Sequence, residues 1–250
     1  MTAATVITAL ALPADARVDH RVPKKLLVEN GAPTAADKRQ INDGIEELLW
    51  VATLKPANLG VPVFRDDARE YLEIAVLTLT LRPGAKASRL TELVHRAIPY
   101  PVFLIQTLPE GLGLSLSHLR WSQGQSGQTV LDGPLVTVAM DSAAPTTDDF
   151  LASLRVASQP RQHLHALYQG WIERCEAYTA ARLTGRFTPA TDAGAAARRR
   201  TALAEHGRVS REITALRAQA ARETQLNRRV ELNLEIKRRE SRLAAVATDF

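Results

Sequence analysis

The sequence predicts an α+β protein: a small mixed β-sheet with flanking helices, followed by a long C-terminal helical extension with coiled-coil character. Two observations lead to this prediction. Between residues 70 and 138, short apolar segments with the period-two alternation of strands are separated by turns and by one short helical segment. Beyond Gly194 the chain has no proline and a single glycine, Gly207, so its composition does not interrupt a helix there.

Charge and composition divide the chain in the same way. The 250 residues are 45% hydrophobic, which suffices for one ordinary domain with an appendage. The formal net charge is +5, and residues 192–250 hold 13 Lys and Arg against 8 Asp and Glu, so this segment carries the whole excess. We expect a mixed α/β globular domain over 1–145, amphipathic helices packing on it over 146–185, and a basic helix over 192–250.

Cysteine content and hydropathy indicate the compartment. Cys175 is the only cysteine, so the chain has no internal disulfide, as is typical of a reducing cytoplasm. The segment from Met1 to Pro13 is mildly apolar but has no basic start, and we interpret it as part of the fold rather than as a signal peptide. No stretch approaches the length of apolar residues that a membrane span needs. We expect a cytoplasmic protein.

The first predicted helix follows a turn at Asn30–Gly31. Thr34 and Asp37 have the spacing of a capping box, in which the two side chains and the first helical amides bond to one another. Apolar residues at positions i, i+4, i+7 and i+8 then predict a helix that ends before Pro56: Ile41, Ile45, Leu48 and Leu49.

A strand, a short helix and a second strand come next. Residues 70–81 alternate with period two and predict a strand that is buried on both faces at its middle. After a turn at 82–84, residues 88–97 have helical spacing, and the prolines of Ile98–Pro101 end this helix. Residues 102–107 predict a buried strand. Because the order is strand–helix–strand, we expect two parallel strands joined by a right-handed crossover.

The remaining strands precede another helix. Residues 113–121 alternate and predict the partner strand of a hairpin, and a loop rich in Gln, Gly and Ser follows over 122–128. Further strand segments are predicted at 129–131 and 135–138. An apolar face then predicts a helix over 161–183: Leu164, Leu167, Tyr168, Trp171, Ile172, Cys175 and Tyr178.

The C-terminal segment is predicted as one helix from about Arg198 to Val246. A heptad register places these residues in a coiled-coil seam: Val209, Ile213, Leu216, Ala220, Asn227, Val230 and Leu234. Glu223 interrupts the seam. A second apolar track indicates either a stutter or a helix contacted on two sides: Leu226, Leu232, Ile236 and Leu243.

Basic side chains are the candidates for binding nucleic acid or a protein partner: Lys24, Lys25, Arg198, Arg199, Arg200, Arg228, Arg229, Lys237, Arg238 and Arg239. An exposed basic helix can neutralise phosphates, and its binding would then weaken with salt. Interleaved glutamates favour instead a helix face with i,i+4 ion pairs that associates with another protein. The third alternative is packing within the chain, as a short bundle with residues 164–178.

No set of residues predicts a catalytic, metal or cofactor site. The close pair His163 and His165 would point about 200° apart on a helix and could not share a metal ion. Residues 124–127 lack the spacing of a nucleophile elbow, and no phosphate-binding loop is present. Cys175 lies on an apolar helix face, which favours core packing over reactivity.

A metal-dependent nuclease is the remaining catalytic alternative. Such enzymes gather carboxylates around a metal ion, usually beside a lysine. The acidic cluster that comes nearest to this pattern precedes and begins the first predicted strand: Asp66, Asp67, Glu70 and Glu73. The next strand, over 102–107, contains no Asp/Glu-x-Lys sequence, which argues against nuclease activity.

Five short motifs occur in order along nearly the whole chain: Leu12–Pro13, Val22–Lys25, Ile45–Trp50, Ile98–Pro101 and Val230–Lys237. In order and spacing they resemble a bacterial family, domain of unknown function 4391. The resemblance implies a companion of DNA helicase and DNA methyltransferase genes in restriction-like or antiphage gene clusters, and it assigns no activity. Pro99 and Tyr100 are expected to form a corner between helix and strand.

From these observations we expect a non-catalytic accessory subunit of a bacterial defence or restriction-like DNA-processing complex. Its basic helix would dock on a helicase or DNA methyltransferase subunit, and DNA would be contacted directly or through the complex. The first alternative is a nucleic-acid-binding module that uses the same arginines. The second is a divergent metal-dependent nuclease. No membrane partner is expected.

Overall fold

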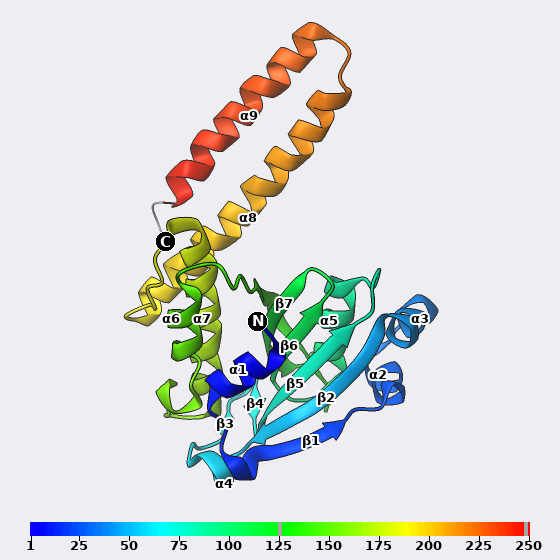
Figure 1. Ribbon diagram of the computed structural model, residues 1–250, viewed down its shortest axis with the longest axis vertical. Coiled ribbons are helices and arrows are strands. Elements are labelled where there is room, and N and C mark those ends of the chain that lie inside the picture. Colours follow the sequence, from blue (N-terminus) through cyan, green and yellow to red (C-terminus); the bar gives the residue numbers. More distant parts are fainter. Residues whose placement is uncertain (125–126, 248–249) are drawn as a thin grey trace. The chain divides into compact units, whose positions relative to one another are not determined.

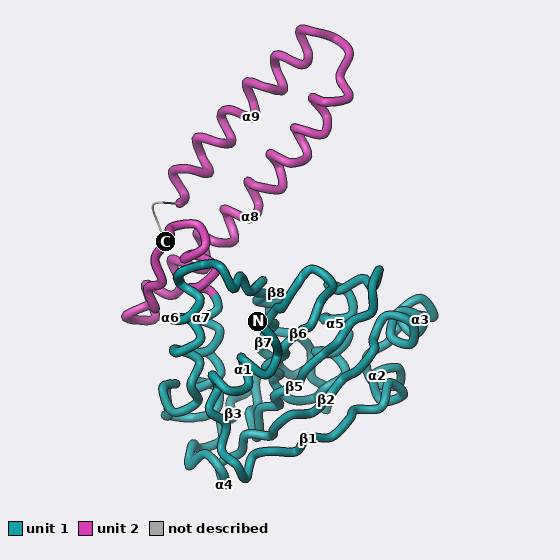
Figure 2. The backbone as a smooth tube through the Cα atoms, viewed as in Figure 1, with its two compact units in different colours: residues 1–175 teal, residues 176–250 magenta. Residues whose placement is uncertain are grey.

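The protein folds into two compact units, residues 1–175 and residues 176–250 (Figures 1 and 2). The computed structural model describes residues 1–124, 127–247 and 250. Unit 1 combines a β-sheet with helices, and unit 2 is helical throughout its described elements. The predicted α+β class is therefore confirmed.

In the described chain, unit 1 is built on a six-stranded sheet of order β1-β2-β5-β6-β7-β8. The strands are β1 (Arg17–Arg21), β2 (Ile45–Leu54), β5 (Ile74–Leu81), β6 (Val102–Leu108), β7 (Gly111–Trp121) and β8 (Thr129–Ala139). Strands β5 and β6 are parallel, and the other neighbouring pairs are antiparallel. A separate two-stranded ribbon pairs β3 (Phe64–Arg65) with β4 (Glu70–Tyr71). The prediction of a small mixed sheet is confirmed.

Helices cover both faces of this sheet (Figure 1). The helices of unit 1 are α1 (Ala3–Leu10), α2 (Lys24–Gly31), α3 (Ala35–Gly44), α4 (Pro56–Leu59), α5 (Ala87–Ala97) and α6 (Thr147–Ser153), and α7 (Leu164–Thr184) continues into unit 2. Two 3-10 turns lie at Ala14–Ala16 and Val156–Ser158.

Neighbouring residues of β6 show how the two layers of helices are held. Leu104 belongs to a buried cluster with residues of α2, α3 and α5, whereas Phe103 packs edge-on against Trp171 of α7 with ring centroids 5.0 Å apart. Successive side chains of a strand point to opposite faces, so one strand anchors both layers. The predicted strand–helix–strand unit with a parallel pair is confirmed.

The predicted helix before Pro56 is wrong in its second half. Helix α3 ends at Gly44, and Ile45–Leu54 form strand β2 between β1 and β5. The pairing of β2 with β5 shifts register twice, and each bulge adds one residue to the strand. Buried residues therefore recur every three positions, at Ile45, Leu48 and Val51, which imitates helical spacing.

Most other predicted elements of unit 1 are present, but the strand predicted over 70–81 is divided into β4, which pairs with β3, and β5 of the main sheet. Thr34 caps α3 by accepting a hydrogen bond from the backbone amide of Asp37 at 3.1 Å. Strand β7 pairs antiparallel with β6, as expected of a hairpin partner, and β8 is one strand where two segments were predicted. The predicted loop at 122–128 includes residues 125 and 126, which lie outside the described chain. No helix in the described part of the chain has the length and hydropathy needed to cross a membrane.

Unit 2 contains a helical hairpin instead of the single helix predicted from Arg198 to Val246. Helix α8 (Ala193–Arg222) and helix α9 (Leu226–Val246) are joined by three residues. Ion pairs from Arg217 to Glu240 at 2.7 Å and from Arg242 to Glu205 at 2.5 Å show that the helices run antiparallel. The prediction failed because the turn has neither glycine nor proline and is stabilised by packing between the two helices.

Candidate functional site

The hairpin of unit 2 is held by one apolar seam. Buried residues of α8 and α9 meet in a single cluster, and further apolar residues pack against it: Val209, Ile213, Leu216, Ala220, Leu232, Ile236 and Leu243. Ion pairs between the helices flank the seam, among them Arg239 with Glu212 at 3.4 Å. The seam confirms that α8 packs through the predicted positions.

The predicted seam is wrong in α9. Val230 and Leu234 are 50% and 54% exposed, and Asn227 is exposed as well. Each helical residue turns the chain by about 100°, so Val230 and Leu234 point about 200° away from Leu232, which lies in the seam. The break between the helices frees α9 to rotate, so Leu232, Ile236 and Leu243 of the second apolar track pack on α8, whereas Leu226 of that track is exposed.

This rotation leaves an apolar stripe on the outer side of α9. Leu226, Val230 and Leu234 lie at positions i, i+4 and i+8, and together they form what we call the α9 stripe. Leu226 is 63% exposed, and these three are the most exposed large hydrophobic side chains in the described chain. A lone exposed hydrophobic residue is ordinary, but a contiguous row is typical of an interaction surface.

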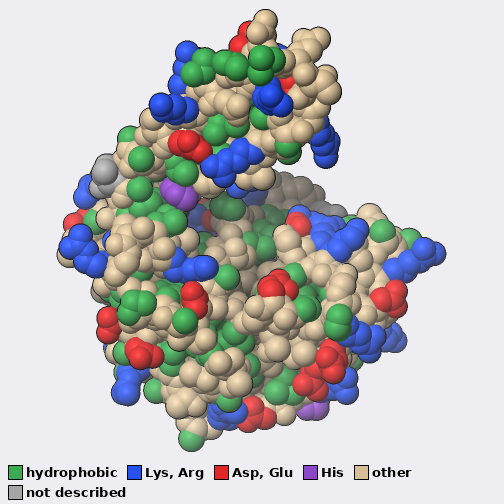
Figure 3. Space-filling model, turned by 45° about the horizontal axis from the view of Figure 1, so that its top comes forward, with side chains coloured by type: hydrophobic (Ala, Val, Ile, Leu, Met, Phe, Trp, Pro, Cys, Tyr) green, Lys and Arg blue, Asp and Glu red, His purple; other side chains and the backbone are tan. Residues whose placement is uncertain are grey.

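Positive charge accompanies the α9 stripe. Lys237, one turn beyond Leu234 on the same face, makes no ion pair within the described chain, and neither does Arg229. The glutamates of α9 are occupied: Glu231 pairs with Arg228 at 2.6 Å, and Glu235 pairs with arginines of its own helix. Figure 3 shows hydrophobic and basic side chains adjoining on the hairpin surface. The stripe is therefore bordered by uncompensated positive charge.

The predicted run of exposed arginines at the start of α8 is only partly present. Arg198 is exposed, whereas Arg199 is 8% exposed and donates a hydrogen bond from Nη2 to the carbonyl of Thr188 at 2.7 Å. Arg200 pairs with the buried carboxylate of Glu176 at 2.7 Å. The prediction that Arg199 faces solvent is wrong because the chain after α7 folds over this side of α8.

The other predicted basic residues, Lys24 and Lys25, lie in unit 1 on α2. Lys24 donates a hydrogen bond to the carbonyl of Asn42 at 2.8 Å, and partial burial lowers the pKa of Lys24, as do two nearby arginines. Lys25 lies 3.7 Å from Glu29, four residues along the same helix. These lysines support local structure, and they belong to a different unit from the arginines of the hairpin.

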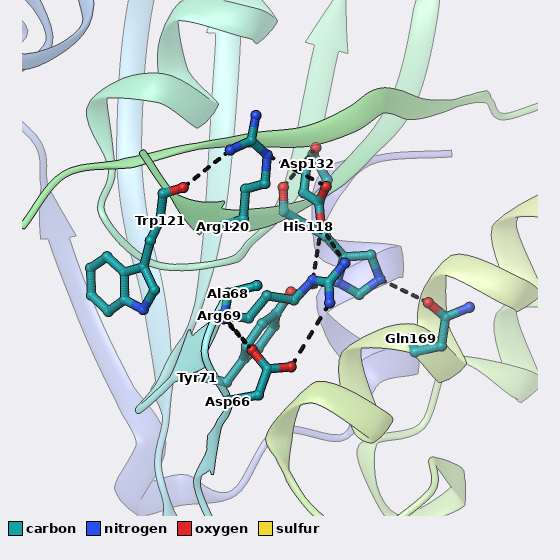
Figure 4. Close-up of polar contacts among 10 residues, drawn as sticks. Asp66, Ala68, Arg69, Tyr71, His118, Arg120, Trp121, Asp132 and Gln169 are labelled. Atoms are coloured by element: carbon teal, nitrogen blue, oxygen red, sulfur yellow. Dashed lines mark hydrogen bonds and ion pairs between the residues drawn. The ribbon is translucent and has the colours of Figure 1, made fainter. Parts of the chain in front are cut away.

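A polar network around His118 in unit 1 is the second candidate (Figure 4). Glu173 accepts a hydrogen bond from the amide nitrogen of Gln169 at 2.9 Å, so the amide oxygen of Gln169 faces His118 Nε2 at 2.8 Å. Nε2 therefore carries the ring proton, and Nδ1 accepts the hydroxyl proton of Tyr71. With both nitrogens engaged, His118 is not a free general base.

The phenol of Tyr71 completes this network from strand β4. Burial raises the pKa of Tyr71, against the opposing effect of a hydrogen bond with the backbone of Leu119, so the phenol stays protonated near neutral pH. Beside it, Arg69 donates to Asp132 of β8 from Nε at 2.8 Å (Figure 4). The network ties the β3–β4 ribbon to the main sheet and to α7, and it presents no activated nucleophile.

The carboxylates considered for a nuclease do not converge. Asp66 accepts hydrogen bonds from two backbone amides of its own turn, at 2.6 and 2.8 Å. Glu70 is paired with Arg65, and Glu73 is paired with Lys55 at 3.3 Å. Among the described residues, no three His, Cys, Asp or Glu side chains are placed to share a metal ion.

The two histidines at the start of α7 are closer than predicted. Their ring centroids are 5.9 Å apart, because His163 precedes the helix and its Nδ1 accepts a hydrogen bond from the amide of Ala166 at 3.0 Å. His165 stacks on His118 with centroids 4.8 Å apart. Burial, followed by the neighbouring cationic groups, lowers the pKa of His165 to about 4.

Buried histidines make the stability of unit 1 depend on pH. His95 of α5 is 1% exposed and hydrogen-bonded to Ser115 Oγ at 2.9 Å, and burial lowers its pKa to about 3. In the unfolded chain His95 binds a proton near pH 6.5. The contribution of neutral His95 to stability is therefore fully present above that pH and is lost as the pH falls toward 3. Between pH 7 and pH 5, His95 alone is expected to cost about 2 kcal/mol of unfolding free energy.

Urea denaturation of the wild type and of His95→Gln at both pH values measures this effect. The glutamine amide can still bond Ser115 but does not titrate, so the variant should lose about 2 kcal/mol less between pH 7 and pH 5. His165, which is partly exposed, contributes a smaller loss of the same sign. Equal pH dependence in both proteins would contradict the prediction.

The geometry defines a class of protein: an α+β domain with helices on both faces of a mixed sheet, followed by a helical hairpin with an exposed apolar stripe. The chain belongs to the family described as domain of unknown function (DUF4391), which matches residues 10–243. The resemblance of the short motifs is thereby confirmed. No curated protein and no solved structure matches the chain significantly.

Proposed function

We propose that this protein is a non-catalytic accessory subunit that binds a protein partner through the α9 stripe. One observation carries the proposal: the three most exposed large hydrophobic side chains of the described chain, Leu226, Val230 and Leu234, lie together on one face of one helix. Their burial in a complex would remove apolar surface from water at roughly 25 cal/mol per Å².

The charges around the stripe favour a partner helix with acidic flanks. Arg229 and Lys237 lack ion pairs within the described chain, and a second copy of α9 would bring the same positive charges together. A partner helix with apolar residues at helical spacing and carboxylates beside them would pack on α9 as the third helix of a bundle.

The class of partner comes from the family resemblance. The resemblance implies a companion of DNA helicase and DNA methyltransferase genes in restriction-like or antiphage gene clusters. We propose that the partner is one of those subunits, in a bacterial cytoplasm. DNA would then be reached through the complex. Direct nucleic-acid binding is the weaker alternative, because Arg228, Arg238 and Arg239 are each paired with a glutamate.

Co-purification with a DNA helicase or DNA methyltransferase subunit of the class that the resemblance implies tests the proposal. Val230→Asp combined with Leu234→Asp is expected to lower recovery of the partner at least tenfold, because two carboxylates would enter an apolar contact. The matched control is Val63→Asp combined with Leu72→Asp, which alters two exposed hydrophobic residues of unit 1, 47% and 44% exposed.

Recovery that is unchanged by the α9 variant, or reduced equally by the control, would exclude the stripe as the docking surface. Duplex DNA binding by the isolated chain, lost at high salt and lost in Arg228→Glu with Arg229→Glu, would favour the nucleic-acid alternative.

A further inference from the structure

Gln106 of β6 is a buried amide with one acceptor left over. Its side chain is 5% exposed, and Nε2 donates to Thr91 Oγ1 of α5 at 2.9 Å, so it lies on the sheet face that α5 covers. Within the described chain Oε1 accepts no hydrogen bond, yet this atom keeps surface that solvent can reach. Because buried amide oxygens are normally hydrogen-bonded, Gln106 offers a free acceptor to the space that it faces.

The orientation of this amide is fixed by Thr91. The Thr91 hydroxyl donates its one proton to the carbonyl of Ala87 at 2.8 Å, one turn earlier in α5. Its oxygen can then only accept from Gln106, so the amide must turn its NH2 group toward Thr91. A flipped amide would place two acceptors against each other. The oxygen of the Gln106 amide is therefore directed away from Thr91.

The space beside Oε1 exists because neighbouring positions of the sheet have small side chains. Gln106 is paired with Gly113 of β7, and Gly113 is paired with Ala139 of β8, so the three form one row on one face of the sheet. A Cβ placed on Gly113 would lie 3.6 Å from Oε1, in ordinary contact. Neither Gly113 nor Ala139 has a side chain long enough to cover the amide oxygen.

A cavity of about 370 Å³ lies over this row, within unit 1. Gln106, Gly113 and Ala139 line it together with the first turn of α5, and Leu108 and Leu135 add apolar surface. None of the described residues that line it is charged. The cavity is large enough for a small organic molecule, and it holds no charge that could balance an ion.

We propose that this cavity binds a neutral small molecule with an apolar body and one O–H or N–H group, which donates a hydrogen bond to Gln106 Oε1. The apolar lining would bury the body, and the acceptor would select the donor. A carboxylate or a phosphate would meet an acceptor and no cation, so the site excludes anions. The site lies in unit 1 and does not depend on the α9 stripe, so the two proposals can fail separately.

A titration of the full chain with para-ethylphenol, followed by ¹H–¹⁵N NMR, tests the site. The phenol carries the donor on an apolar ring, para-ethylanisole has a methyl group in place of the hydroxyl proton, and para-ethylbenzoate is an anion. With the phenol we expect saturable shifts of the Gln106 side-chain NH2 and of the Gly113 amide. The anisole should bind about tenfold more weakly, because it leaves Oε1 without a donor, and the benzoate should cause no shift.

Gln106→Met keeps the length of the side chain and removes the acceptor, while Thr91 can still donate to Ala87. In this variant the phenol and the anisole should bind with equal affinity, a change that a loss of packing alone would not produce. The matched control is Gln162→Met, which alters an exposed glutamine of unit 1 and should keep the preference for the phenol.

Gly113→Ala decides the case if Gln106→Met fails to fold. The φ of Gly113 is not in the left-handed region, and the added methyl would lie beside Oε1 and 3.3 Å from the carbonyl oxygen of Val138, which needs to shift slightly. The methyl should weaken binding of the phenol severalfold.

Three results would overturn the proposal: no saturable shift with para-ethylphenol up to its solubility, equal binding of the phenol and the anisole by the wild type, or binding of the phenol that is unchanged in both variants. Shifts with the benzoate equal to those with the phenol would overturn the assignment to a neutral ligand.

Discussion

Replacement of Trp171 by alanine is expected to lower the unfolding free energy of unit 1 by about 3–5 kcal/mol. The indole is fully buried, its N–H donates to the carbonyl of Leu154 at 2.8 Å, and its ring packs edge-on against Phe103 of β6. Alanine would leave a large cavity between α7 and the sheet. It would also leave the buried carbonyl of Leu154 without this donor.

Urea denaturation monitored by far-UV circular dichroism measures the loss. The control is Trp121→Ala, which removes the same side chain from a partly exposed position at the end of β7 and should cost about 1 kcal/mol. Similar midpoints for the two variants would show that Trp171 is not a central contact between α7 and the sheet.

Replacement of Val209 by aspartate is expected to open the hairpin of unit 2. Val209 is fully buried in the seam between α8 and α9, so the carboxylate would lose water without gaining a partner. We expect a cost of about 3 kcal/mol or more. The helices should separate and fray while unit 1 stays folded.

Two signals separate the units in this experiment. The three tryptophans, Trp50, Trp121 and Trp171, all lie in unit 1, so their fluorescence reports only that unit, whereas far-UV circular dichroism also reports α8 and α9. Val209→Asp should lower the helical signal and leave the fluorescence transition unchanged.

The matched control is Val230→Asp. A continuous coiled-coil helix would bury both valines in one seam, but the hairpin buries Val209 and leaves Val230 50% exposed. Val230→Asp should therefore change the unfolding free energy by about 0.5 kcal/mol or less. Equal destabilisation by the two aspartates would contradict the hairpin and support the single helix.

Most elements of unit 1 could be predicted because their signals are local. The prolines at 99 and 101 end α5 wherever it packs, and the apolar run of β6 and the alternation of β7 are visible within each strand. Strand β2 could not be predicted, because its two bulges arise from pairing with β5 and change the spacing of its buried residues from two to three. Such pairing depends on residues about 30 positions away.

The candidate sites depended still more on tertiary contacts. In the sequence, Leu226, Val230 and Leu234 are simply apolar residues at helical spacing. A second track at Leu232 and Ile236 has the same spacing, so the sequence does not show which track packs in the seam. Packing on α8 decided which track is buried and which is exposed. Likewise, nothing in the run Arg198–Arg200 distinguishes the buried arginine from its exposed neighbours.

The sequence alone determined the α+β class, the family, the apolar face of α7, and the location of the excess positive charge in the last 60 residues or so. These properties follow from composition and from periodicity within single segments. Only the tertiary structure decided that the last segment is a hairpin, that its outer side carries the α9 stripe, and that Arg199 is buried. Burial is set by contacts between segments, and the residues of one segment do not specify which partner it will meet.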